Sequence, residues 1–388
     1  MGRYLQQFRE AFRKGDMVLL LLCLITTAFG CLIIASATNY MGSLRLVIVQ
    51  IAAALLGVLL FCIVASVDAD FFSEHRMSLV IFNTVLLLML LPFGTDNGTG
   101  NRSWLDFPLL PVNIQPAEIC KITYILIMAS VMSSHQNRLS HFSSVMHMVF
   151  HLGLLVGLNM VLSRDAGVSL IFVFIFIGMT FAGGVSLLWF LVAAGGIVIM
   201  FPILWKYFMD GYQKLRIEVL FNPDLDPLGT GPRWHTVNSL KSLTGGGMTG
   251  QGLFEGNRTQ HGALTAQHTD YVFSAIGEEL GYMGCALAIT LLCLIIARCI
   301  WVGNRSQDSM RRLICFGAAS ALIFQVISNV GMCIGVTPVI GLTLPFISYG
   351  GSSIVSLYAM LGLVSGVYAR PASTSHERYI RPPLQSYE

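Results

Sequence analysis

Charged residues are scarce in this sequence. Asp, Glu, Lys and Arg make up only 11% of its 388 residues, whereas 55% are hydrophobic. Soluble domains carry about a quarter charged residues, so the composition excludes an ordinary soluble protein and predicts an all-α integral membrane protein. A spanning helix needs about 20 apolar residues. We expect about ten such helices, at residues 18–37, 46–66, 78–93, 116–133, 145–162, 167–183, 185–206, 270–298, 311–336 and 351–369.

Basic residues are almost absent from every second loop. Lys and Arg in short loops resist translocation across the membrane. With the N-terminus inside, the inner segments hold thirteen of them, whereas the short outer loops hold only Arg45, Arg102 and Arg164. We therefore predict that both termini are cytoplasmic and that the long loop 207–269, between helices seven and eight, is extracytoplasmic. Residues 1–369 would form a single polytopic membrane domain, and 370–388 a short cytoplasmic tail.

Paired cysteines are also lacking. The nine cysteines fall mostly within apolar spans and form no CxxC pair, which argues against a disulfide framework or a cysteine metal site. The net charge of +3 is accounted for by the inner loops. The charge pattern therefore gives no reason to expect a nucleic-acid partner.

One acidic residue stands at the edge of the eighth predicted span. Asp270 follows His268 and Thr269 and leads into an apolar run. A carboxylate at a bilayer edge loses hydration, so it usually caps a helix, finds a partner, or serves chemistry, ion passage or substrate contact. On this residue alone, N-capping is the favoured interpretation, because a carboxylate suits the positive end of a helix.

Two further outer segments combine polar residues with a helix start. Trp104 beside Arg102 is either a membrane-interface anchor, which we favour on these residues alone, or a stacking and phosphate-binding pair. Glu118 is explained by its place in the first turn of helix four, after Pro116. Lys121 is not, because it would carry an ammonium into the hydrocarbon. Either Glu118 neutralises it as an i,i+3 pair, or both line a polar cavity for an anionic ligand, and the two are compatible.

The outer loops offer three more features. Asp165 in a short outer turn is equally suited to capping the next helix and to lining an outward-facing pocket. Arg216 belongs to a mixed basic and apolar stretch typical of a helix lying in the membrane interface. A second such helix is predicted from Trp234 to Leu243, and the glycines of 245–252 that follow it favour a mobile lid over the cavity. These glycines lack the lysine spacing of a P-loop.

The stretch 329–353 is too apolar for an exposed loop and too rich in Gly and Pro for a helix. Non-helical backbone at membrane depth is tolerated only where protein buries it or where it lines a water-filled cavity. We expect a re-entrant element that closes one side of an outward-open cavity. The alternative, a tight loop with Ser352 capping helix ten, explains only the end of the stretch.

Together these segments resemble the SEDS family (shape, elongation, division and sporulation), the group of RodA, FtsW and SpoVE. The resemblance covers most of the chain, and its last two motifs are highly specific. In chain order, the motifs are Gly100-Asn101-Arg102-Ser103-Trp104-Leu105, Gln115-Pro116-Ala117-Glu118 with Lys121, Asp165-Ala166-Gly167, Tyr212-Gln213 with Arg216, His268-Thr269-Asp270-Tyr271-Val272-Phe273 through Gly277-Glu278-Glu279-Leu280-Gly281, and the run from Pro338 to Ser353.

The resemblance implies a ten-helix peptidoglycan glycosyltransferase that polymerises lipid II on the outer face of a bacterial cytoplasmic membrane, usually paired with a class B penicillin-binding protein. Asp270 matches the family's essential aspartate and Trp104 an essential tryptophan, so catalysis becomes the favoured role of Asp270. The chain departs from the family just before this motif. A Leu-Pro-Glu is usual there, and here Leu264 is followed by Thr265, Ala266 and Gln267, which puts metal binding in doubt.

Lipid II carries its disaccharide-peptide on a diphosphate, so the enzyme must deprotonate a sugar hydroxyl and stabilise a departing diphosphate. A partly buried carboxylate suits the general base, and a divalent cation, Mg²⁺ or Mn²⁺, could assist the departure. Arg102, Lys121 and Arg216 are candidate contacts for diphosphate or peptide carboxylate. A single displacement would invert the α-linked donor to a β-1,4 product. The expected substrate-binding residues are Arg102, Trp104, Glu118, Lys121, Asp165, Arg216, His268, Ser348 and Ser352.

Two other functions stay open beside this one. A lipid-precursor flippase would also use a polar cavity, but it needs a charged path to the inner leaflet, where the helices offer little beyond His147 and His151. A non-catalytic membrane scaffold for a transpeptidase needs only helix surfaces, and it leaves Asp270 and Lys121 unexplained. Elongation, division and sporulation are equally compatible with the sequence.

Overall fold

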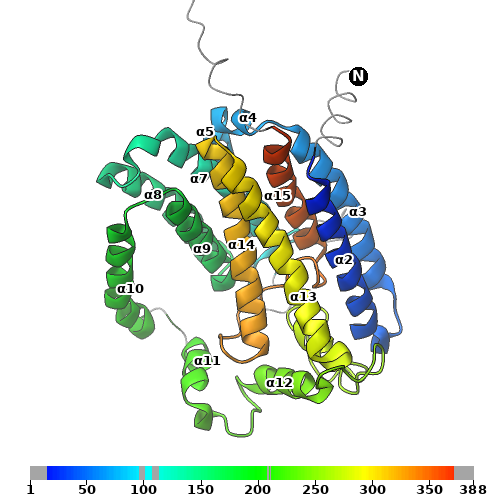
Figure 1. The fold of residues 1–388 in the computed structure, drawn as a ribbon. Coiled ribbons are helices and arrows are strands. Elements are labelled where there is room, and N and C mark those ends of the chain that lie inside the picture. The colour runs from blue at the N-terminus through cyan, green and yellow to red at the C-terminus, as the bar shows by residue number, and fades with distance from the viewer. Residues whose placement is uncertain (1–14, 96–100, 107–112, 208, 210, 371–388) are drawn as a thin grey trace, which may run out of the picture.

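The computed structural model describes residues 15–370 except 96–100, 107–112, 208 and 210, so most of the predicted tail, 371–388, lies outside the described residues. Within them the fold is almost entirely α-helical (Figure 1). Nine described helices are long and apolar enough to cross a membrane, and α9 is a shorter apolar helix. The ten predicted spans are confirmed as α2 (Met17–Ala37), α3 (Arg45–Ser66), α5 with α6 (Arg76–Leu88 and Leu90–Phe93), α7 (Pro116–Ser134), α8 (Phe142–Leu162), α9 (Ala166–Ala182), α10 (Leu187–Tyr207), α13 (Val272–Arg305), α14 (Ser309–Cys333) and α15 (Gly351–Ala369).

Short elements connect the spans. Helices are present where the two interfacial helices were predicted, as α11 (Gly211–Phe221) and α12 (Trp234–Gly246). The others are α4 (Ala69–Glu74), the 3-10 turns η1 (Asn39–Met41), η2 (Gln136–Arg138) and η3 (Pro223–Leu225), and a two-stranded antiparallel sheet of β1 (Gly94–Thr95) and β2 (Trp104–Leu105).

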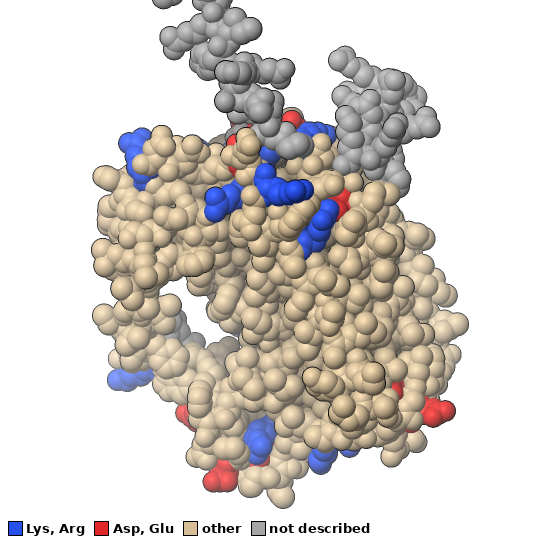
Figure 2. Space-filling view, viewed as in Figure 1, with Lys and Arg blue, Asp and Glu red and all other residues tan. Residues whose placement is uncertain are grey.

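Charged residues on one face of the bundle lie at its two ends. Figure 2 shows Lys, Arg, Asp and Glu gathered at opposite ends of one face, with a broad uncharged band between them. We call the end where α2 begins the N-terminal end, and the opposite end the Asp270 end. At the N-terminal end the buried Asp16 carboxylate pairs with Arg298 at 2.8 Å, which ties the start of α2 to α13. The uncharged band matches the belt expected of a membrane protein.

The helices differ in how deeply they lie in the bundle. The spans of α7, α14 and α15 are more than 70% buried, whereas α10 buries none of its most apolar window and stands apart in Figure 1. Small residues let α15 approach α3 closely. A Cβ on Gly57 would lie 2.7 Å from the Tyr358 ring, and one on Gly362 would lie 2.7 Å from the Phe61 carbonyl oxygen. Close backbone approach of this kind is the usual way that membrane helices associate.

The helix that follows Asp270 is kinked. Gly281 has φ 64° and ψ −161°, so α13 consists of a short helix and a long one, where the sequence predicted one uninterrupted span. The kink leaves backbone groups of α13 without helical partners, and the glycine strip supplies them. The amides of Gln251 and Gly252 donate to the carbonyls of Glu278 and Glu279, both at 3.0 Å, and the Tyr282 amide donates to the Gly247 carbonyl at 2.9 Å.

The glycines of 245–252 therefore serve close packing in this structure. A Cβ on Gly246 would lie 1.8 Å from the Gly277 carbonyl oxygen, and one on Gly250 would lie 2.1 Å from that of Glu279. These contacts argue against the mobile lid that the sequence favoured for this strip. Glycine is needed here because the backbone of α13 occupies the space that a side chain would take.

The stretch between α14 and α15, residues 334–350, is non-helical as predicted, although it is shorter than the predicted 329–353, and its later part, Leu342 and 344–348, is buried. Gln50 of α3 fixes its far end, because the side-chain amide donates to the Ser348 carbonyl at 3.1 Å and accepts from the Gly350 amide at 3.1 Å. Backbone without secondary structure is thus satisfied inside the protein, as membrane depth requires.

Candidate active site

Asp270 lies at the junction of three segments. It ends the long loop, directly precedes α13, and is held from α14 by Asn329, whose side-chain amide donates to the carbonyls of Asp270 at 2.8 Å and Leu342 at 2.6 Å. The N-cap of α13 is Tyr271, and no side chain caps that helix. The capping interpretation of Asp270 is therefore wrong, and its partly exposed carboxylate is left to act elsewhere.

A second carboxylate lies close enough to Asp270 to affect its protonation. Burial, followed by the negative charge of Asp165, raises the pKa of Asp270 to about 6. Burial raises the pKa of Asp165 as well, and the charge of Glu118 adds to it. Three acidic residues from α7, the α8–α9 turn and the long loop thus converge. A carboxyl group with a pKa near neutrality is suited to accept a proton from a substrate.

Asp165 caps α9, one of the two roles that the sequence left open, and it also bonds to Ser103. Its Oδ1 accepts from the Val168 amide at 3.1 Å and caps α9, while its Oδ2 accepts from the Ser103 hydroxyl at 3.3 Å. A Cβ on Gly167 would lie 2.6 Å from the Ile340 side chain, so α9 begins directly against the non-helical stretch. The cap therefore also brings the Ser103 segment to the site.

The predicted Glu118–Lys121 pair is present. Lys121 Nζ lies 2.8 Å from Glu118 Oε1, and both side chains are almost fully buried. The Ser356 hydroxyl of α15 donates to the other Glu118 oxygen at 2.6 Å. Each charge thus has a partner inside the bundle, which is the condition under which buried charges are tolerated.

The Arg102 and Trp104 segment is anchored through its middle residue. Ser103 is buried and contacts Asp165, whereas Arg102 is exposed and Trp104 is half-buried in β2. The structure therefore brings this segment beside the carboxylates. Gly100 of the same motif lies outside the described residues.

Arg216 reaches the site from α11. Its Nη1 donates to the Val339 carbonyl at 3.4 Å, so the guanidinium lies beside the non-helical stretch. His235 of α12 stacks on Tyr271, with ring centroids 5.7 Å apart and planes 9° apart. Burial and the charge of Arg216 lower the pKa of His235. The neutral imidazole of His235 therefore packs on Tyr271, the residue next to Asp270, with the Arg216 guanidinium close by.

Two of the predicted contacts, Ser348 and His268, play a structural part, and a third, Ser352, does not. The Ser348 hydroxyl donates to the Thr269 carbonyl at 2.6 Å and accepts from the Leu344 amide at 2.8 Å, so it fastens the non-helical stretch to the Asp270 loop. The His268 carbonyl accepts a hydrogen bond from the Tyr349 amide at 2.8 Å, and burial lowers the pKa of the His268 imidazole. The Ser352 hydroxyl is buried and has no hydrogen-bond partner among the described residues.

Sequence reasoning missed Ser103, His235 and Asn329 as site residues. Ser103 and Asn329 stand inside motifs that drew attention to their neighbours, and each acts through a partner about 60 residues away. His235 carried no signal beyond its place in a predicted helix. The glutamate missing before His268 falls at Ala266, and the next residue is neutral and structural, since the Gln267 side-chain amide donates to the carbonyls of Ala37 at 2.7 Å and Thr259 at 2.8 Å.

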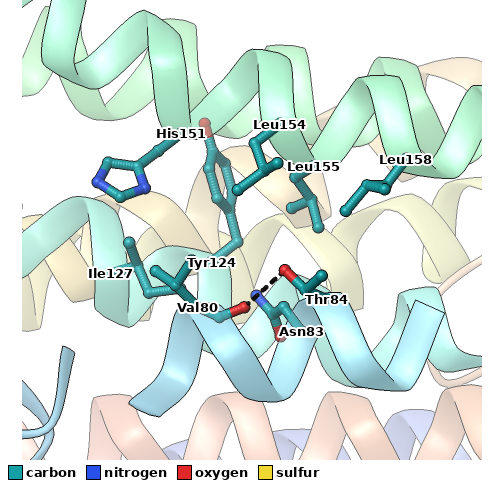
Figure 3. A pocket seen from close by; sticks show the side chains of 9 residues that line it. All are labelled: Val80, Asn83, Thr84, Tyr124, Ile127, His151, Leu154, Leu155 and Leu158. Carbon is teal, nitrogen blue, oxygen red and sulfur yellow. Dashed lines mark hydrogen bonds between the residues drawn. The ribbon is translucent and has the colours of Figure 1, made fainter. Parts of the chain in front are cut away.

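A hollow between α5, α7 and α8 lies apart from this site (Figure 3). Leucines of α8 line one side and Asn83 and Thr84 of α5 the other. The cavity has a volume of about 20 Å³, which suits a single water molecule and excludes a sugar. Among the described residues, no three His, Cys, Asp or Glu side chains come together as a metal site.

The family model described as "FTSW_RODA_SPOVE: Cell cycle protein" matches residues 16–372. The chain belongs to the FtsW/RodA/SpoVE family. The match covers every segment described above, including the Asp270 loop, the Glu118–Lys121 pair and the non-helical stretch. The resemblance found in the sequence motifs is thereby confirmed.

Members of this family with curated functions are similar over nearly the whole chain. The peptidoglycan glycosyltransferase MrdB of Escherichia coli K12 is 30% identical and aligns with 91% of this chain and 93% of its own. The probable peptidoglycan glycosyltransferase FtsW of Trichlorobacter lovleyi is also 30% identical, over 95% of this chain and 98% of its own.

Solved structures of the family share the fold. A structure described as "Structural coordination of polymerization and crosslinking by a peptidoglycan synthase complex" has a TM-score of 0.79 and 28% identity, covering 93% of this chain and 99% of that one. The rod shape determining protein RodA of Thermus thermophilus has a TM-score of 0.68 and 25% identity, with 93% and 98% covered.

Proposed function

We propose that this family member polymerises lipid II into glycan strands, with Asp270 as the general base. The chain is a multi-pass membrane peptidoglycan glycosyltransferase of cell-wall synthesis, as its family and its curated relatives indicate. The observation that carries the assignment of Asp270 is its environment: a half-buried residue whose carboxylate caps no helix and whose pKa is raised to about 6.

The proposed reaction is a single displacement at the donor sugar. Asp270 accepts the proton of the acceptor hydroxyl, the oxygen attacks the anomeric carbon, and the lipid diphosphate departs with the bonding electrons. Attack from the face opposite the leaving group converts an α-linked donor into a β-1,4 product. A base whose pKa lies near the working pH is largely ionised and still accepts the proton effectively.

Cationic side chains among the described residues would stabilise the departing diphosphate. Arg216 beside Val339 and the exposed Arg102 are the better candidates, because guanidinium groups bind phosphate in two-point contacts. Lys121 is paired with Glu118 and almost fully buried. We therefore assign Lys121 to the wall of the site, where it offsets the acidic charge that Glu118 brings near Asp165.

A divalent cation is proposed only in company with the substrate. Asp165 is the carboxylate that would hold it, because a cation bound to Asp270 would lower the pKa of the proposed base, and the protein alone offers too few ligands among the described residues. Mg²⁺ is commonly bound by one or two carboxylates together with substrate phosphates. When bound, it would neutralise the leaving diphosphate.

The proposed setting is the outer face of a bacterial cytoplasmic membrane, with both termini cytoplasmic. The distribution of Lys and Arg in the short loops supports this orientation. A class B penicillin-binding protein is the proposed partner, because a structural relative belongs to a synthase complex that couples polymerisation with crosslinking.

The function is tested by incubating the purified protein with lipid II, with and without a class B transpeptidase. We expect glycan polymer that an enzyme specific for β-1,4 linkages degrades. Lipid II transfer across vesicles without any polymer would favour the flippase instead. If the transpeptidase preparation alone makes polymer and this protein alone makes none, this chain is a scaffold.

A further inference from the structure

A polar depression opens at the N-terminal end, on the opposite side of the bundle from Asp270. Two adjoining hollows, of about 400 and 480 Å³, share the lining residues Gln136, Asn137, Leu139 and Gly183. They form where the α7–α8 connection, the end of α9 and the α13–α14 turn meet. We call the combined depression the N-terminal pocket. None of its lining residues belongs to the site around Asp270.

The N-terminal pocket carries two arginines from different elements. Arg138 of η2 lines one hollow, and Arg312 of α14 lines the other. The Arg312 guanidinium donates to the Ala182 carbonyl at 3.2 Å, which holds it against the end of α9. A guanidinium has five N–H donors in a fixed fork, so this contact orients the group and leaves it able to bind an anion.

One acidic residue, Asp308, lines the same pocket against the two arginines. It caps α14 by accepting from the Arg311 amide at 3.1 Å, and its carboxylate lies 3.9 Å from the Arg311 side chain, which is closer to Asp68 and Asp70. The remaining titratable group in the lining is His141. The pocket therefore presents a net positive charge, with the geometry that favours phosphate.

Apolar surface begins directly beside the N-terminal pocket. Phe142 at the start of α8 is 64% exposed, and Leu187 and Leu188 at the start of α10 are 66% and 65% exposed. Trp189 packs on Phe142 and donates from its indole nitrogen to the carbonyl of Ser140, a pocket residue, at 2.8 Å. An anchored tryptophan between polar and apolar surface is typical of the headgroup level of a membrane.

We propose that the N-terminal pocket binds the phosphate of an anionic phospholipid, whose acyl chains lie along α8 and α10. Basic pockets between membrane helices bind such headgroups, and Figure 1 shows α10 at the outside of the bundle, where lipid would reach it. The adjoining apolar surface selects a lipid over soluble phosphate. The orientation proposed above places this lipid in the cytoplasmic leaflet. The site is independent of the catalytic assignment.

Native mass spectrometry in detergent tests this directly. The purified protein is titrated with phosphatidylglycerol, with zwitterionic phosphatidylcholine, and with phosphatidylglycerol in millimolar inorganic phosphate. We expect phosphatidylglycerol to bind most tightly and inorganic phosphate to compete weakly. Arg138→Gln with Arg312→Gln should weaken phosphatidylglycerol at least about tenfold, the effect of losing one charge-assisted contact.

The matched control is Arg305→Gln. Arg305 is exposed at the same end, stacks on Trp301 at 4.4 Å and lies outside the pocket lining. Arg305→Gln should retain the wild-type affinity for phosphatidylglycerol. Arg312→Lys should lose only part of that affinity, because a point charge remains. Equal affinity for the two lipids, full displacement by inorganic phosphate, or equal losses in the double variant and in Arg305→Gln would each overturn the proposal.

Discussion

A single carboxylate decides the chemistry proposed here, and its neighbours decide its protonation. Asp270 is partly buried and near Asp165, and both factors favour its neutral form. The general base must be ionised to accept a proton. Activity should therefore be lost as the pH falls through about 6 and be nearly complete above about 7.

The contribution of Asp165 can be separated by substitution. Asp165→Asn removes a negative charge and keeps a residue that caps α9 well. Loss of this charge stabilises the ionised Asp270, so the acid limb of the pH–rate profile should move to lower pH, by up to about 1 unit. Asp308→Asn, a cap at the opposite end of the bundle, is the control and should leave the limb in place. A shift to higher pH would contradict the assignment.

The Glu118–Lys121 pair makes a prediction about stability. Removing one partner leaves a charge uncompensated among buried groups, which costs about 3 kcal/mol or more. We expect Glu118→Gln and Lys121→Met each to lower the melting temperature in detergent more than the double variant does. If the two single losses simply add in the double variant, the pair does not interact.

At the scale of elements, the site depends on segments that hold one another at fixed separation. The glycine strip after α12 bonds to the carbonyls around the kink of α13, and Asn329 of α14 fastens Asp270 to the non-helical stretch. The strip is therefore expected to act as part of the frame that positions Asp270. Its amides at Gln251 and Gly252 should be protected from hydrogen exchange in the isolated protein.

Two adjacent glycines test this frame. Gly246→Ala places a Cβ 1.8 Å from the Gly277 carbonyl oxygen, whereas Gly245→Ala meets only the flexible end of Gln251 at 3.3 Å. Gly246→Ala should lower the melting temperature and the polymerisation rate together. Gly245→Ala should be neutral or stabilise slightly, by up to about 1 kcal/mol, because alanine favours a helix. Equal effects of the two changes would show that the strip is not tightly packed.

The sequence predicted the elements better than their contacts. Apolar runs of sufficient length predict spanning helices because the bilayer imposes one length and satisfies no backbone group. The kink at Gly281 lay inside such a run, and hydropathy does not register it. The use of 245–252 as packing glycines was also missed, because a glycine fitted against another backbone and a glycine in a mobile loop look alike in sequence.

At the scale of the whole molecule, the bundle has a separate polar region at each of its two ends. The Asp270 end gathers acidic and basic residues from α7, the α8–α9 turn, α11 and the end of the long loop, while the N-terminal end carries the Asp16–Arg298 pair and the N-terminal pocket. Asp270, Asp165, Glu118 and Lys121 were identified from sequence because charge near hydrocarbon is conspicuous. Asn329 and His235 were not, because neutral partners become visible only when distant segments meet.

The central claim is tested most directly by the polymerisation rate of purified Asp270→Asn on lipid II, measured beside the wild-type protein at a pH above 7. Asparagine keeps the size of the side chain and removes the base. The account predicts a fall of at least about 100-fold, the usual scale of a lost general base, with an unchanged melting temperature. Polymer formation by Asp270→Asn at a rate near that of the wild type would contradict it.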